Sequence, residues 1–354
     1  MTTLLESGEA PLRAPLPGLR ATPPPARRWR GRVAALLGVA IALWIEPGNV
    51  FVIPVLFCLI VPFEKLFPRH RGQRVRRPLV GLDMRYALVS PLLNIAAVGV
   101  GAVIAVVSLA WIPGLLLRPV VGWLPAAATP LLGIALFDLA IYWGHRWSHE
   151  VPALWRFHAV HHSTEQLDWI SGFRVHPLDG IIIAPAFVLL LAAGFSAEFT
   201  GVLAVVQFVL GLFLHANVRW RLRPLHRLII TPEFHHWHHA NETDAHHTNY
   251  STFLPLWDIV FGTYRMPADR RPQVYGVDEH LPATMAGQLW FPFRRVRPIR
   301  WALRNPHDAL RAGWALLRST LSDVRRSSSR RSAGTRRPVP SSPNPFRPER
   351  FRDR

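Results

Sequence analysis

The sequence predicts an all-α, multi-span transmembrane protein, with about four to six membrane segments and a cytoplasmic, histidine-rich helical cap. Three observations lead to this prediction. Of the residues, 50% are hydrophobic and only 18% are charged, which is a balance typical of membrane proteins. The apolar residues gather in long runs that short basic loops separate. The histidines repeat at helical spacing at the ends of such runs.

The first third of the chain contains no motif and is expected to be membrane-embedded. Residues 1–27 are rich in proline and small residues, which predicts a disordered start. A basic flank then precedes an apolar run at 33–45, and a second run follows at 50–63. These two runs predict a helical hairpin, although the first is shorter than the roughly 20 residues that a full span needs. We therefore expect residues 28–125 to be transmembrane helices.

The next apolar runs predict a membrane topology, which the positions of the basic residues can test. Residues 86–117 form one long apolar run, and residues 127–147 form the next predicted span. Between them we expect a turn region marked by Pro113, Gly114, Gly122 and Pro125. If the N-terminus lies inside, the basic loop at 69–77 and the first histidine, His145, both fall on the cytoplasmic side, as the positive-inside rule requires.

The remainder of the chain predicts a second hairpin and a basic tail. Residues 180–194 and 199–214 are apolar and either cross the membrane or enter it partway. Residues 266–322 read as a cytoplasmic C-terminal segment, and residues 323–354 as a disordered basic tail. The net charge of +19 lies largely in tails and short loops, which favours contact with an anionic membrane surface. Few aromatic residues accompany it in the tail, so we expect no nucleic-acid partner. The expected location is the cytoplasmic, inner membrane.

Two histidine-rich stretches carry the chemistry of the chain. WGHRWSHEVPALWRFHAVHHS contains a helix-breaking EVP, and TPEFHHWHHAN opens with a threonine N-cap. Residues spaced i, i+3 and i+4 share one face of a helix, so each HxxxH or HxxHH set can aim two or three imidazoles together. Neutral imidazole is the commonest metal ligand and suits iron, zinc, copper and nickel. The number of histidines predicts a site for two metals, built from three helical segments.

Other residues are candidates for supporting or completing this site. His236 is predicted to point away from its neighbours on the same helix, and His215 is a further candidate ligand at the end of an apolar run. His176 precedes a proline and could either complete the site or cap a turn. Asp138 shares a helical stripe with His145, so its carboxylate could orient an imidazole or bind another helix. The segment at 249–265 is expected to pack beneath the cluster.

Residues 130–265 resemble the fatty acid hydroxylase and sterol desaturase superfamily of integral membrane di-iron oxygenases. The resemblance rests on DLAIYWGHRWSH, WRFHAVHHS, the HP pair at 176–177, TPEFHHWHH and NYSTFLPLWDIVFGT. It implies a catalytic domain at 126–265, with a histidine ahead of the last cluster that His215 matches. It also implies that two iron ions are held by His145, His149, His158, His161, His162, His235, His238 and His239.

The same resemblance implies an oxidoreductase that uses dioxygen to hydroxylate or desaturate a lipid. Electrons are expected from an external ferredoxin, cytochrome or reductase, because the chain shows no nucleotide-binding fingerprint or haem motif. One alternative is a membrane zinc-dependent hydrolase, but the sequence has no HExxH and an excess of histidines. Another is a non-catalytic metal- or lipid-binding membrane protein or a transporter, whose ligands would be expected near the bilayer midplane.

Overall fold

A computed structural model describes residues 49–293 continuously, with a few single residues outside this range. The predicted disordered ends, 1–27 and 323–354, lie outside the described residues, as do most of the apolar run at 33–45 and most of the segment beyond Phe293. Within 49–293 the regular elements are helices, accompanied by two isolated β-bridges. The all-α prediction is confirmed for this part of the chain. These helices all belong to the same compact unit.

The first described helix, α2 (Asn49–Leu66), shares one cluster of buried apolar side chains with α3 (Val80–Val107). Ile53, Leu56 and Ile60 are buried on one side of α2, at the spacing of a helical face. Large apolar side chains on the rest of α2, Phe51 among them, are exposed. Near the end of α2, the buried carboxylate of Glu64 accepts backbone hydrogen bonds from Trp169 and Asn217, at 3.0 and 2.9 Å. α2 is thus fixed to segments far along the chain.

The long apolar run at 86–117 is two helices rather than the single predicted segment. After α3 the chain turns at Leu109, which has a φ of 54°, and α4 (Trp111–Trp123) begins. The predicted turn region at 113–125 was therefore wrong over most of its length, because Pro113 and Gly114 lie in the first turn of α4. Proline is tolerated there, since the first N–H groups of a helix have no partner within it.

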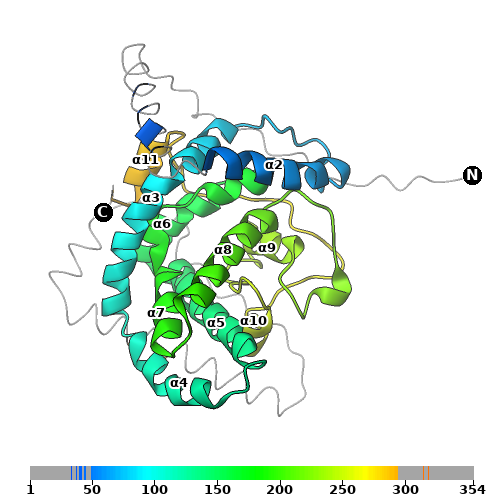
Figure 1. The fold of residues 1–354 in the computed structure, drawn as a ribbon. Helices are drawn as coiled ribbons and strands as arrows, with labels where there is room; N and C mark the ends of the chain where they lie inside the picture. The colour runs from blue at the N-terminus through cyan, green and yellow to red at the C-terminus, as the bar shows by residue number, and fades with distance from the viewer. Residues whose placement is uncertain are drawn as a thin grey trace, which may run out of the picture. The chain divides into compact units, whose positions relative to one another are not determined.

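Four helices form the scaffold of the histidine region. They are α5 (Thr129–Glu150), α6 (Pro152–His162), α7 (Ala184–Ala192) and α8 (Ala197–Leu214). α7 packs against α4, α5 and α8, while α6 folds back on α5 (Figure 1). The predicted break at Glu150-Val151-Pro152 is confirmed, because proline can begin a helix but cannot continue one.

Shorter elements close the unit. Three of them lie before the last histidine helix: η1 (Trp169–Phe173), η2 (Pro177–Ile181) and η3 (Arg223–Leu225). The predicted start of α9 (Pro232–His238) is confirmed, because the Thr231 hydroxyl accepts a hydrogen bond from the Phe234 N–H at 3.3 Å. The chain then forms α10 (Leu256–Phe261), α11 (Met285–Trp290) and η4 (Phe291–Phe293).

Among the described helices, α8 alone is long and apolar enough, by length and composition, to cross a membrane. Several of its apolar side chains are exposed, including Val202, Val205 and Phe208. The predicted number of spans and the cytoplasmic position of the histidine cap therefore remain predictions.

Candidate metal centre

Nine of the candidate histidines converge into two buried groups. Within each group, the potential ligand atoms all lie within 4.8 Å of one another. Group A consists of His145, His149, His158, His162 and His238, and group B consists of His161, His215, His235 and His239. No member is more than 9% exposed. His215, a candidate both from its place at the end of an apolar run and from the family resemblance, is part of group B.

Helix geometry explains how both groups arise from so few segments. α6 supplies His158 and His162 to group A and His161 to group B, while α9 and its end supply members to both groups. α5 contributes only to group A, and the end of α8 only to group B. The rings of His162 and His239 stack with their centroids 4.2 Å apart. The two groups are therefore immediate neighbours, as a two-metal site requires.

Backbone carbonyls set the tautomer of several rings. The Nδ1 atoms of His145 and His238 donate to the carbonyl oxygens of Tyr250 and Thr248, at 2.7 and 3.0 Å. In group B, His161 and His215 donate in the same way to Arg174 and Gly211, at 3.2 and 2.6 Å. A carbonyl can only accept, so each of these Nδ1 atoms carries the proton. The Nε2 atom of each neutral ring then presents a lone pair to its group.

The opposing Nε2 atoms point to a shared cation. The Nε2 atoms of His161 and His215 lie 3.2 Å apart, and those of His162 and His238 lie 3.1 Å apart. When both Nδ1 atoms carry the protons, as in His161 and His215, two lone pairs face each other and no hydrogen bond forms. A cation between them would satisfy both, because metal-bound histidines commonly donate the other ring nitrogen to a carbonyl or carboxylate.

Burial keeps these imidazoles neutral, as metal binding requires. Removal from water lowers the pKa of His215 to about 4 and that of His238 to about 3, although a backbone hydrogen bond opposes the shift in each case. Burial also lowers the pKa of His161 and His235 well below the ordinary value. At neutral pH no proton competes with a metal for these rings.

The residues present fit a resident pair of metal ions. Among the described residues, His149 Nε2 is a buried nitrogen without a hydrogen-bond partner, which a native protein rarely tolerates unless another partner exists. A nitrogen ligand lies about 2.1 Å from a metal, so two opposite ligands lie about 4.2 Å apart. The candidate ligand atoms of each group all lie within 4.8 Å of one another, so several of them can reach one ion.

Asp179 contacts a histidine of group A, and the sequence reasoning missed it. Its Oδ2 accepts a hydrogen bond from Nδ1 of His158 at 2.9 Å, and both side chains are buried. Its Oδ1 has no hydrogen-bond partner among the described residues. A carboxylate behind a ligand imidazole fixes the ring and raises its basicity. The sequence feature that could have identified Asp179 is its position two residues after the HP pair at 176–177, in the turn of η2.

His176 and His236 lie outside both groups. Nδ1 of His176 accepts from the Leu178 N–H at 3.1 Å, and Nε2 donates to the Leu289 carbonyl at 3.0 Å. His176 therefore caps η2, which was one of its two expected roles. His236 donates from Nε2 to the Ala216 carbonyl at 3.1 Å, so its ring points away from its neighbours as predicted.

Asp138 acts on the site through the segment beneath it. Its carboxylate accepts hydrogen bonds from the backbone N–H groups of Thr252, Phe253 and Leu254, at 2.9, 3.0 and 3.0 Å. That segment also contains Tyr250, whose carbonyl orients His145. The expected link between Asp138 and an imidazole is therefore indirect. The segment at 249–265 packs against the cluster as expected.

Acid is expected to destabilise the metal-free protein. The folded-state pKa values of His215 and His238 lie below the ordinary value of 6.5, so an unfolded chain binds more protons as the pH falls below 6.5. The free energy of unfolding should thus decrease, by about 1.4 kcal/mol per histidine at about pH 5.5, or roughly 3 kcal/mol for the two.

This expectation can be checked by denaturant unfolding of chelator-treated protein at pH 7 and at about pH 5.5. A free energy of unfolding that stays constant between these pH values would contradict neutral, buried rings. Loading with metal should raise the free energy of unfolding at both pH values, since an ion that binds only the folded state stabilises it.

The family described as fatty acid hydroxylase matches residues 130–263. All nine histidines of groups A and B, together with Asp138 and Asp179, lie inside this range. No solved structure matches the chain significantly.

Similar proteins of known activity include several lipid oxidoreductases. An ornithine lipid hydroxylase from Rhizobium tropici is 34% identical over 173 residues, which cover 48% of this chain and 52% of that protein. Human alkylglycerol monooxygenase is 31% identical over 40% of this chain and 31% of its own length. A Delta(7)-sterol-C5(6)-desaturase from Nicotiana tabacum is 27% identical over 42% and 54%, respectively. The chain thus spans about half or less of the length of these relatives.

Proposed function

Because residues 130–263 belong to the fatty acid hydroxylase family, we propose that the chain is a membrane-bound oxidoreductase that uses dioxygen to hydroxylate or desaturate a lipid. The observation that carries this proposal is the convergence of nine buried histidines in two adjacent groups. Groups made only of imidazole suit a redox-active metal, whereas a zinc hydrolase commonly adds a general-base carboxylate beside its histidines.

Iron is the metal that best fits the proposal, with one ion in group A and one in group B. When bound, the two ions would activate dioxygen so that an unactivated C–H bond of the substrate can be oxidised. The protein holds the imidazoles in place through Tyr250, Thr248, Arg174 and Gly211, whose carbonyls accept the Nδ1 protons.

Side chains around the groups keep water away from the centre. The Trp155 ring lies 5.2 Å from the His149 ring and 5.5 Å from the His162 ring, between centroids. The Tyr250 ring, which is fully buried, lies 5.4 Å from that of His149 on the segment beneath. A dry site strengthens the electrostatic interactions within it and protects reactive species from side reactions.

A lipid substrate and a membrane location are supported by the exposed apolar surface. α2 and α8 expose large apolar side chains along their length, and α8 is long enough to span. The segment after α8 alternates exposed arginines, Arg223 and Arg227, with exposed Leu222 and Leu228. This pattern suits the headgroup region of a bilayer, where arginines reach phosphates and leucines enter the acyl layer. We place the protein in the inner membrane with the histidines toward the cytoplasm.

The electrons for the reaction are proposed to come from a separate ferredoxin, cytochrome or reductase. Each turnover that reduces dioxygen while oxidising a C–H bond needs two electrons beyond those the substrate supplies. No nucleic-acid partner is required by this function.

The proposal is tested by lipid mass spectrometry of membranes that contain the wild-type chain or His161→Ala, supplied with isotope-labelled dioxygen. We expect a lipid that gains a labelled oxygen atom or loses two hydrogens only with the wild-type chain and only in the presence of dioxygen. A product whose new oxygen atom is unlabelled, and so comes from water, would indicate a hydrolase and contradict the proposal. Equal turnover by His161→Ala would contradict the assignment of the centre, provided that both chains insert equally into the membrane.

A further inference from the structure

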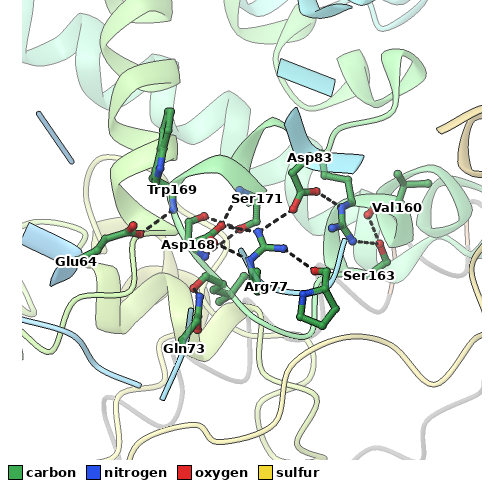
Figure 2. Close-up of polar contacts among 12 residues, drawn as sticks. Glu64, Gln73, Arg77, Asp83, Val160, Ser163, Asp168, Trp169 and Ser171 are labelled. Carbon is green, nitrogen blue, oxygen red and sulfur yellow. Dashed lines mark hydrogen bonds and ion pairs between the residues drawn. The ribbon is translucent and has the colours of Figure 1, made fainter. Parts of the chain in front are cut away.

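A buried network of ion pairs joins Arg77 and α3 to η1, the short helix that lies beside group B. Arg77, just before α3, donates through Nε and a terminal nitrogen to the two carboxylate oxygens of Asp168, at 2.6 and 2.5 Å (Figure 2). Asp168 is the N-cap of η1 and exchanges hydrogen bonds with Ser171 there. Bidentate arginine–carboxylate pairs have a fixed geometry, so Arg77 determines where η1 begins.

Asp83 of α3 extends this network to the other end of η1. One of its oxygens accepts from Arg77 at 2.7 Å, and the other accepts from Nε of Arg174 at 2.5 Å. The side chains of Asp83 and Arg174 are 0% and 1% exposed. The two arginines and two aspartates balance in charge. Removing Asp83 would leave two buried guanidinium groups to share one carboxylate, which is strongly unfavourable.

Arg174 contacts group B directly, and Gly172, two residues before it, lies close to His215. The carbonyl of Arg174 accepts the Nδ1 proton of His161, and its side chain donates to the Ser163 hydroxyl at the end of α6 at 3.2 Å. A Cβ atom added to Gly172 would lie only 3.2 Å from Nδ1 of His215. Two of the four histidines of group B, His161 and His215, thus lie against η1 and Arg174, the segment that Asp83 and Arg77 bind.

Group A is oriented by other acceptors. His145 and His238 donate to the carbonyls of Tyr250 and Thr248, and His158 donates to the carboxylate of Asp179. None of these contacts involves the side chain of Asp83 or Arg174. A change at Asp83 should therefore reach group B first.

We propose that Asp83 is a positioning residue for group B, which fixes the Arg174 carbonyl and thereby the ring of His161. Asp83 lies outside residues 130–263, the range that the family matches, so this chain completes its metal centre with a residue from a helix that carries no family motif. The inference rests on the proposed function, because it takes groups A and B to be metal sites.

Cobalt(II) titration of the chelator-stripped full chain in detergent tests the inference, with visible absorbance reporting imidazole coordination. The wild-type chain is expected to bind two ions. Asp83→Asn should bind the first ion as the wild type does and the second about 10- to 100-fold more weakly, the range typical of lost outer partners of ligand residues. Asp83→Glu, which keeps the charge, should recover part of this affinity. Asp244→Asn, which removes an exposed carboxylate, should bind both ions normally.

Each outcome separates this inference from the proposed function. A wild-type chain that binds fewer than two ions would contradict the two-metal centre itself. Two ions bound equally well by the wild type and Asp83→Asn would overturn the positioning role, as would equal weakening of both ions. If Asp83→Asn does not fold, Ser163→Ala provides the test, because it removes the Arg174 contact at the end of α6. It should weaken the second ion alone by a few-fold, and an unchanged second ion would overturn the inference.

Discussion

His238→Ala is expected to reduce lipid oxidation by at least about 100-fold, beyond the effect usually seen when only a supporting residue is lost. His238 belongs to group A, and its Nε2 lies 3.1 Å from that of His162. Alanine removes one of the five imidazoles that could hold an ion in group A. Turnover of the lipid substrate and the iron content of the purified chain are the two measurements, and both should fall together.

His236→Gln is the matched control for this substitution. His236 lies on the same helix and is as buried as its neighbours, but its ring bonds to the Ala216 carbonyl instead of entering a group. Glutamine keeps a donor for that carbonyl, so turnover should stay within a few-fold of the wild type. If His236→Gln lost as much activity and iron as His238→Ala, the two groups would not be the centre.

Asp179→Asn is expected to lower the affinity for metal by about 10- to 100-fold. Asparagine can still accept the His158 Nδ1 proton, so the ring keeps its hydrogen bond and loses only the negative charge behind it. A less basic imidazole donates less electron density to a cation. The loss of iron to a competing chelator, compared between variant and wild type, measures the change.

Asp278→Asn is a suitable control for Asp179→Asn, because Asp278 is an exposed residue whose carboxylate accepts a hydrogen bond from Asn241. The Asp278→Asn variant should lose iron to the competing chelator as the wild type does. Unchanged iron affinity in Asp179→Asn would show that the carboxylate only holds η2 in place and does not tune His158.

The sequence predicted which histidines converge because the relevant spacing is local. Ligands at i, i+3 and i+4 point the same way on any helix, and the breaks at Pro152 and Pro232 are set by adjacent residues. His236 was excluded by the same reasoning, and its contacts agree. His215 needed only its place at the end of an apolar helix.

The supporting contacts could not be predicted because they join distant parts of the chain. Asp138 was expected near an imidazole from its helical stripe, but it binds the backbone at 252–254, more than a hundred residues away. The pairing of Asp83 with Arg174 joins residues 91 positions apart. The break at Leu109 depends on a left-handed backbone at leucine, which residue preference disfavours.

An iron-edge anomalous difference map of the crystalline holoenzyme tests the central claim most directly. The account predicts two peaks for each chain, one enclosed by the imidazoles of group A and one by those of group B. A single peak, or peaks that appear only at the zinc edge in protein that still oxidises lipid, would contradict it.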